Sequence, residues 1–143
     1  MFAKKIFLLS SGILIAGLSY TNTSMRVSAA AEGIYTTGQA TRGGTLYQAQ
    51  CSSCHGSDLA GVGQNPPLTG DEFLSKYEGE SIDALFQTIH NTMPATKPGS
   101  LTPQQTADAL AFILSSNKYL AGTKELPSDE ESLKKIQLEK PPQ

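Results

Sequence analysis

The stretch Cys51-Ser52-Ser53-Cys54-His55 decides how the rest of the chain is interpreted. Two cysteines separated by two residues and followed at once by a histidine form the attachment pattern of c-type haem. The spacing suits the chemistry, because two thiols must reach two vinyl groups on one edge of a porphyrin while the next side chain lies under the iron. Cys51 and Cys54 would form thioethers, and His55 would be the proximal ligand. The pattern predicts one covalent haem c.

The cysteine pair also has other possible roles. In an oxidising compartment, Cys51 and Cys54 could form a disulfide. A zinc site fits poorly, since His90 is the one remote nitrogen ligand left and the chain has no second cysteine pair. A thioredoxin-type redox pair expects a βαβ context, which the surrounding sequence lacks. Haem attachment is favoured, and the disulfide is the main alternative.

The composition is typical of one small domain with appendages. A chain of 143 residues without tryptophan has a small core. A covalently held macrocycle would supply the missing apolar bulk. The net charge is −2, and it becomes −5 without residues 1–31, which carry three basic residues and no acidic one. This balance argues against a nucleic-acid partner.

Residues 1–31 have the pattern of a secretory signal peptide. Lys4 and Lys5 precede an apolar stretch from Ile6 to Leu18, and small residues at 28–31 suit cleavage. The apolar stretch is 13 residues long, whereas a bilayer-spanning helix needs about 20. We therefore expect export to the periplasm, with membrane contact only if the signal stays uncleaved. Export fits covalent haem attachment, which takes place outside the cytoplasm.

A helix from Thr36 or Thr37 to about Gln50 leads into the attachment pattern. Its residues at positions 40, 43, 44, 47 and 51 share one helical face. Glycine inside a helix costs about 1 kcal/mol relative to alanine, so Gly43 and Gly44 need a structural reason. We expect a close crossing with a second helix, with a helix start after Gly44 as the alternative.

The last main helix is predicted to begin at Thr102 and end near Asn117. Thr102 and Gln105 have the spacing of a capping box, and Pro103 stands at the first helical position. This helix is the candidate to cross the first one, with Phe112 filling the space above the glycines.

Between these helices, residues 56–65 are glycine-rich and should form a loop. The segment Pro66-Pro67-Leu68 follows and should pass beside His55, where a backbone carbonyl can accept the imidazole Nδ1 proton. The alternative is an ordinary turn before a short helix over residues 71–76.

A helix from Ser81 to about Asn91 is followed at once by Met93 and Pro94. Proline ends the helix and stiffens the loop that presents Met93. A neutral thioether favours ferrous iron, so His55 with Met93 as axial ligands would give a comparatively high reduction potential. The alternative role for Met93 is to fill a gap in the core.

His90 is the rival sixth ligand. Bis-histidine ligation would require the helix to turn His90 inward at the expense of Phe86 or Ile89. The polar segment after residue 121 is expected to be a surface strap or a short exposed helix, because Leu133, Ile136 and Leu138 are too few for a second core.

Taken together, residues 36–121 resemble the class I cytochrome c domains. The resemblance rests on Gly43-x-x-Leu46-Tyr47, the haem signature at 51–55, Pro66 to Leu68, Met93-Pro94 and the helix over 102–114. It implies an all-α fold of three to five helices around one covalent haem, with the first and last helices packed together. It also implies that the Pro66 carbonyl meets the ligating histidine and that Leu68 lies on the ring.

A narrower resemblance involves residues 66–73, 85–98, Asn117 and Leu126-Pro127. These stretches are similar to the monohaem cytochromes that serve, or are fused to, periplasmic quinoprotein (PQQ) alcohol dehydrogenases. The resemblance implies a soluble monomeric carrier that takes single electrons from a periplasmic dehydrogenase and passes them towards a terminal oxidase. The alternatives are a haem enzyme with an open sixth site, peroxidase-like or gas-binding, and a haem-free disulfide-bonded domain.

Overall fold

The structure is a computed structural model that describes residues 27–28 and 33–141. The segment expected to be an export signal therefore lies outside the described residues, apart from Val27 and Ser28. Within the described part of the chain, no helix has the length and apolar character needed to cross a membrane.

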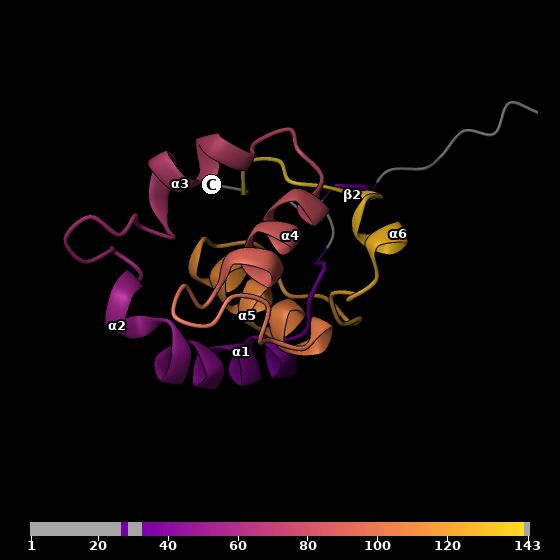
Figure 1. Cartoon of the computed structure of the whole chain (residues 1–143). Helices are drawn as coiled ribbons and strands as arrows, with labels where there is room; N and C mark the ends of the chain where they lie inside the picture. Colours follow the sequence, from indigo (N-terminus) through magenta and orange to yellow (C-terminus); the bar gives the residue numbers. More distant parts are fainter. Residues whose placement is uncertain (1–26, 29–32, 142–143) are drawn as a thin grey trace, which may run out of the picture.

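The described residues form six helices and one short pair of strands, as Figure 1 shows. The strands pair in parallel, with Val27 opposite Ile136 and Ser28 opposite Gln137. The rest of the ordered structure is helical, which confirms the expected all-α fold. The elements are β1 (Val27–Ser28), α1 (Thr37–Gln50), α2 (Ser52–His55), α3 (Gly70–Tyr77), α4 (Ile82–Thr92), α5 (Pro103–Ser116), α6 (Glu130–Leu133) and β2 (Ile136–Gln137).

The ends of the helices follow from local side-chain chemistry. Thr102 and Gln105 form both hydrogen bonds of the predicted capping box at the start of α5. Thr36 caps α1 by accepting a hydrogen bond from the backbone of Gln39. Ser81 precedes α4 as expected, but its side chain makes no capping hydrogen bond.

Helices α1 and α5 cross in close contact, as the two glycines predicted. A Cβ atom on Gly43 would overlap the backbone carbonyl of Asp108 on α5. A Cβ on Gly44 would lie 3.1 Å from the Phe112 ring. That ring packs on Tyr47 with a centroid distance of 5.1 Å. The missing side chains therefore allow the two backbones to touch, and Phe112 fills the space beside them.

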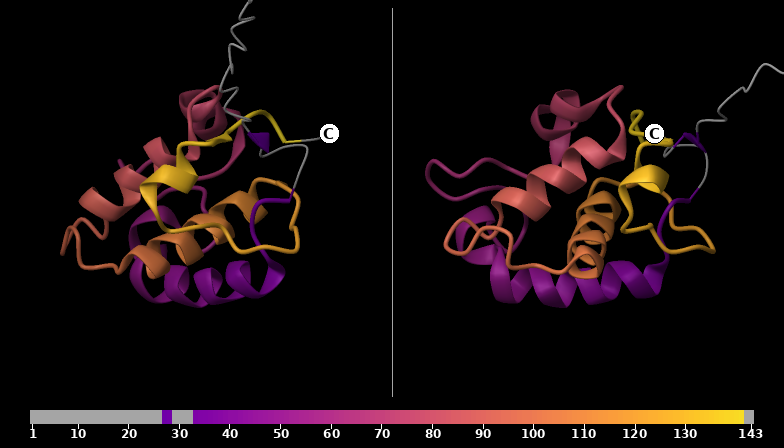
Figure 2. Two further views of the ribbon diagram at one scale, coloured as in Figure 1. Left: turned by 90° about the vertical axis from the view of Figure 1, so that its right-hand side faces the viewer. Right: turned by 45° about the vertical axis from the view of Figure 1, so that its right-hand side comes forward.

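Helix α5 is the centre of the molecule, with α1 on one side and α4 on the other (Figures 1 and 2). It is buried around most of its circumference, and Leu110 and Leu114 are among the least exposed side chains of the core. Burial on several sides makes α5 the framework against which α1 and α4 are placed.

The segment after residue 121 is a strap that contains the one-turn helix α6, so it combines both states expected for it. Leu126, Leu133 and Leu138 are almost fully buried in the main core. The buried amide of Gln39 donates to the Leu126 carbonyl at 3.0 Å and accepts from its N–H at 2.7 Å. The strap is thus fixed to the start of α1, at the end of that helix away from α2 (Figure 2).

A charged cluster at the surface joins α1, α5 and the strap. Arg42 on α1 forms a two-point ion pair with Asp108 on α5, at 2.9 and 3.0 Å. It also contacts Glu125 of the strap at 2.8 Å. The hydrogen bonds to Asp108, followed by those to Glu125, raise the Arg42 pKa. The guanidinium is exposed to solvent, so this cluster specifies the orientation of the parts more than it stabilises them.

The first prediction concerns the helix crossing. Gly43→Ala should lower the free energy of unfolding by about 1–3 kcal/mol, because its methyl group overlaps the α5 backbone. Gly38→Ala in the same helix is the control, since the nearest atom to its Cβ would be the Thr36 Oγ1 at 3.9 Å. That change should be neutral or stabilise by up to about 1 kcal/mol. Chemical denaturation measures both, and equal effects would contradict the close crossing.

Candidate haem-binding site

A single turn of chain carries the three residues of the attachment pattern. Cys51 ends α1 by donating its N–H to the Tyr47 carbonyl at 2.8 Å. The Cys51 carbonyl then accepts from the N–H groups of Cys54 at 3.1 Å and His55 at 3.0 Å. The close helix crossing at Gly43 fixes the direction of α1 and therefore the position of this turn.

The two cysteines do not form a disulfide. Cys54 is exposed and Cys51 is half-buried. Burial raises the pKa of the Cys51 thiol, and the neighbouring Cys54 raises it further. Both sulfur atoms are therefore free to form other covalent bonds.

His55 is buried, and its ring orientation is fixed by one hydrogen bond. Its Nδ1 lies 3.0 Å from the Pro66 carbonyl oxygen. A carbonyl oxygen can only accept, so Nδ1 carries the proton. The other nitrogen, Nε2, has no hydrogen-bond partner within the described residues. It therefore keeps a lone pair available for a metal.

The loop after His55 folds back on itself to bring Pro66 to this position. The Gly61 N–H donates to the His55 carbonyl at 2.8 Å, and the Leu68 N–H donates to the Leu59 carbonyl at the same distance. Gly61 has φ +82°, and a Cβ there would overlap the Asn65 carbonyl. A larger residue at this position would push the segment of Pro66 away.

Tyr47 supports the attachment turn by a hydrogen bond to its end. Its hydroxyl donates to the Gly56 carbonyl at 2.7 Å, and its side chain is fully buried. Burial is the main cause that raises the pKa of Tyr47 to about 12, with smaller contributions from Cys51 and Asp58. The phenol therefore stays a neutral donor over the physiological pH range.

A cavity of about 330 Å³ opens beside the attachment turn. Its size is within the range of cofactor pockets, ~300–1,000 Å³. Most of its lining is apolar, and Cys51, Cys54, His55, Pro66, Leu68 and Met93 all contribute to it. The other apolar and aromatic contributors come mainly from α1, α3, α4 and α5: Tyr47, Phe73, Tyr77, Leu85, Ile89, Ala109 and Ile113.

Met93 reaches the cavity from the loop after α4. Its N–H donates to the Ile89 carbonyl at 3.0 Å, which closes the last turn of the helix. The next residue, Pro94, is buried and joined to Met93 by a cis peptide bond. The loop turns again where the Lys97 N–H donates to the Pro94 carbonyl at 2.8 Å. Met93 is therefore held at the cavity wall by backbone contacts on both sides.

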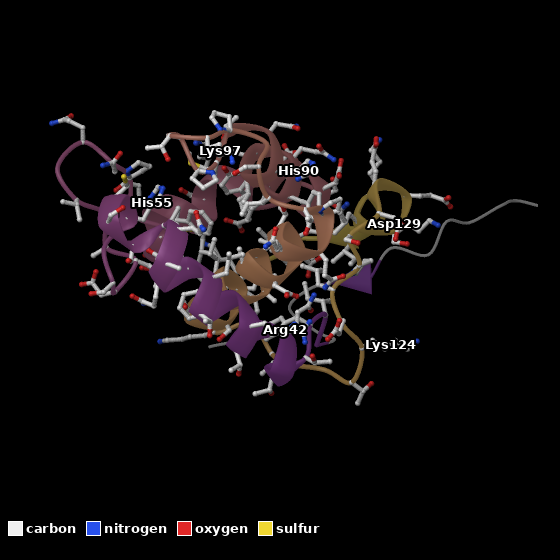
Figure 3. The ribbon with its side chains drawn as sticks, turned by 60° about the horizontal axis from the view of Figure 1, so that its bottom comes forward. Arg42, His55, His90, Lys97, Lys124 and Asp129 are labelled. Carbon is white, nitrogen blue, oxygen red and sulfur yellow. The ribbon has the colours of Figure 1, made fainter. Side chains whose placement is uncertain are left out.

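His90 does not line this cavity. Its Nδ1 lies 3.1 Å from Thr106 Oγ1, and its ring stacks on Phe86 at 5.8 Å. The Thr106 hydroxyl already donates to Thr102 O, so it accepts the proton of His90 Nδ1. Figure 3 shows His55 and His90 on different elements of the fold. The contacts of His90 join the end of α4 to the start of α5 and do not favour the bis-histidine alternative.

Two supporting residues were not expected from the sequence. Tyr47 was placed on the buried face of its helix, but nothing indicated a bond to Gly56. Asn117 was expected to end α5, yet its side chain also binds the backbone of Leu68 and Gly70. The signal in the sequence is a polar residue at the predicted end of a helix, and this does not reveal a partner almost fifty positions away.

These residues fit a covalently attached haem. Two unpaired thiols, a buried imidazole with a free Nε2 and a thioether all border one apolar cavity. The fold and the site define a c-type cytochrome domain.

Comparison with known families places the chain more closely. Residues 38–113, more than half of the chain, match the family described as "Cytochrome C oxidase, cbb3-type, subunit III". The chain belongs to this family of cytochrome c domains. Membership implies haem binding and electron transfer as the general role.

Two solved structures are similar to this chain. One is the sulfane dehydrogenase SoxCD from Paracoccus pantotrophus, with 21% identity and a TM-score of 0.53 over 91% of this chain and 67% of that one. The other is the thiosulfate dehydrogenase TsdBA from Marichromatium purpuratum, with 29% identity and a TM-score of 0.41. That match covers 68% of this chain and 23% of the other. The similarity to SoxCD supports the cytochrome c fold of this chain.

The second prediction concerns Tyr47. Its folded-state pKa of about 12 exceeds the ordinary value of about 10, so the stability it contributes is present below pH ~10 and is lost as the pH rises towards 12. Tyr47→Phe should therefore reduce the loss of stability between these pH values. At neutral pH it should cost about 1–3 kcal/mol, because the Gly56 carbonyl loses its partner. Denaturation at a series of pH values measures both effects.

Tyr119→Phe is the matched control. Burial likewise raises the Tyr119 pKa to about 12, but its hydroxyl donates to the Glu139 carbonyl of the strap. Both variants should flatten the alkaline loss of stability, and only Tyr47→Phe should alter the visible spectrum. Identical spectra in the two variants would contradict a supporting role of Tyr47 at the site.

Proposed function

We propose that this protein is a soluble, monomeric periplasmic electron carrier with one haem c. In this proposal Cys51 and Cys54 hold the haem as thioethers, and His55 and Met93 are its axial iron ligands. The observation that carries the proposal is that one apolar cavity is lined by all four of these side chains. The segment 1–31 would be removed on export, which leaves a cytochrome domain at 36–121 and the strap at 122–143.

Each residue would have a defined part in the site. The Pro66 carbonyl keeps the His55 ring in one orientation, so that Nε2 is the nitrogen presented to the iron. Met93 supplies a weak neutral ligand from a loop fixed at both ends. The apolar walls, including Leu68 and Ile113, exclude water. When bound, the haem supplies an iron that changes between Fe(III) and Fe(II) by one electron.

With both axial positions filled by side chains, the chain would have no site for substrate chemistry. This distinguishes the carrier from the alternative of a haem enzyme with an open sixth position. Met93 decides between them, because it is the methionine that lines the cavity.

The surface around the cavity mouth would be the docking face for redox partners. Val62 is 51% exposed, which is unusual for a large apolar side chain in this structure. Gly61, Ala95 and Pro98 belong to the loops at 56–69 and 93–102 and carry no charge. Lys97 is a cation of the second loop, and Glu72 and Lys76 of α3 line the cavity. A face with an apolar loop surface and few charges suits brief contacts of small buried area.

The donor would be a periplasmic dehydrogenase and the acceptor a terminal oxidase. The resemblance to cytochromes of quinoprotein alcohol dehydrogenases supports a quinoprotein donor. The chain would then act as the acceptor partner of a separate enzyme.

The third prediction tests the axial ligands. The mass of the mature protein should include one covalent haem, and the oxidised form should show the weak near-infrared band of methionine bound to iron. Met93→Leu should abolish that band, lower the reduction potential and open the iron to small ligands such as carbon monoxide, because leucine offers no ligand atom. A reduced-minus-oxidised spectrum with a redox titration measures these changes.

His90→Ala is the control for the rival ligand. This change should leave the near-infrared band and the coordination of the iron unchanged. If His90→Ala abolishes the spectrum of the six-coordinate form while Met93→Leu does not, bis-histidine ligation is correct. A colourless protein with an intramolecular disulfide would instead establish the haem-free alternative.

The fourth prediction concerns long-range steering. The net charge is negative, so oxidation of the reduced protein by a cationic complex such as tris-phenanthroline cobalt(III) should slow as salt is added, while oxidation by anionic hexacyanoferrate(III) should become faster. Stopped-flow kinetics at several ionic strengths measure both rates. Lys97→Gln should slow the oxidation by hexacyanoferrate(III), since it removes a cation near the docking face. Rates that do not vary with ionic strength would rule out steering.

A further inference from the structure

We propose that Asn117 is a positioning residue for His55. It fixes the backbone of residues 66–70, whose Pro66 carbonyl accepts the His55 Nδ1 proton. The inference rests on the proposed function, in which His55 is the proximal ligand of the haem.

Asn117 follows α5 and is 5% exposed. Its side-chain amide makes two bonds to a segment almost fifty residues earlier in the chain. Nδ2 donates to the Leu68 carbonyl at 2.8 Å, and Oδ1 accepts from the Gly70 N–H at 3.1 Å. Nδ2 also donates to Ile113 O of its own helix at 2.8 Å. The amide therefore binds the segment on two sides of Thr69.

The side chain is not needed to close the end of α5. The backbone N–H of Asn117 already donates to Ile113 O at 3.1 Å and to Leu114 O at 3.0 Å. The Tyr119 N–H donates to the Leu114 carbonyl as well, at 3.1 Å. Since the backbone caps the helix, the bonds from the side chain to Leu68 and Gly70 call for a separate explanation.

Within the described residues, the hydrogen bonds that join the segment 66–70 to the end of α5 are those of the Asn117 side chain. Besides the bond between the Pro66 carbonyl and His55, the segment has a backbone–backbone bond from the Leu68 N–H to Leu59 O at 2.8 Å, within the same loop that follows His55. That bond keeps the loop folded but does not fix it relative to α5. Pro66 lies two residues before Leu68, so the position of its carbonyl follows from where Leu68 is held.

Asn117 also stands in the wall between two cavities. Leu68 and Ile113, whose carbonyls accept from Nδ2, both line the haem cavity. Asn117 itself lines a second, outer cavity of about 760 Å³ together with Gly70 and Ser116. A change at Asn117 therefore acts on the haem cavity through the backbone of its wall and not by contact with the haem.

The test compares two buried amides that bind backbone in the same way. Asn117→Leu keeps a similar volume and introduces no charge, but leaves Leu68 O and Gly70 N without their side-chain partner. Gln39→Met is the matched control, because Gln39 binds the N–H and carbonyl of Leu126 at the opposite end of α1. Both variants lose buried hydrogen bonds, and both should lose stability.

The readout is the His55 Nδ1 proton in the reduced haem-loaded protein, observed by nuclear magnetic resonance. In Asn117→Leu its resonance should move upfield, and its exchange with solvent should become faster by roughly tenfold, the effect of weakening one buried hydrogen bond. The reduction potential should rise, because a weaker bond to Pro66 makes the imidazole a poorer electron donor. Gln39→Met should show none of these changes, even where its loss of stability equals that of Asn117→Leu.

The proposal is overturned if Asn117→Leu matches Gln39→Met in resonance position, exchange and potential. Should Asn117→Leu fail to fold, Asn117→Ser is the milder variant, since its hydroxyl is too short to bind both Leu68 and Gly70. Asn117→Ser is then compared with Gln39→Met in the same three measurements, and a match between the two variants overturns the proposal. Failure of the proposed function would appear separately, as a wild-type protein that lacks haem or lacks histidine ligation.

Discussion

The structure depends on the contact between the backbones of α1 and α5 at Gly43. Because no side chain separates the helices there, the end of α1 that carries Cys51 is fixed relative to α5. Helix α5 in turn places Ile113 in the cavity wall and Asn117 behind it. The attachment turn after α1 and the part of the cavity wall on α5 are thus both positioned by one helix crossing, which can be followed in Figure 2. A cofactor joined by two covalent bonds needs such a framework, since its position cannot adapt to a wall that moves.

Around this crossing, backbone carbonyls accept hydrogen bonds from side chains at the site. The Pro66 carbonyl sets the proton on His55, and the Gly56 carbonyl receives the Tyr47 hydroxyl. Each contact uses a donor that would be costly to bury alone. The site therefore couples the stability of the loop after His55 to the chemistry of its imidazole. On the side of Met93, the contact between His90 and Thr106 connects the helices that enclose the methionine loop.

The sequence was most informative where the signal is local. The capping box at Thr102 and the glycine pair at 43–44 each depend on residues within one or two turns, and the structure confirms both. The haem signature at 51–55 is equally local, and its cysteines and histidine border one cavity. Ser81 was placed at the start of its helix, although it forms no capping bond. The contacts of Gln39 and Asn117 could not be predicted, because an amide side chain gives no indication of which distant backbone it will bind. The same holds for Leu133 and Leu138, which seemed too few for a core and instead complete the existing one.

In the proposed site, the iron is bound by His55 and by the sulfur of Met93. X-ray absorption at the iron edge of the oxidised protein measures this most directly. We predict a low-spin iron surrounded by five nitrogen atoms, four from the porphyrin and one from imidazole, and by one sulfur atom. An iron shell without sulfur, or with only five ligands, would contradict the assignment of Met93 and with it the proposal of a closed electron-carrying site.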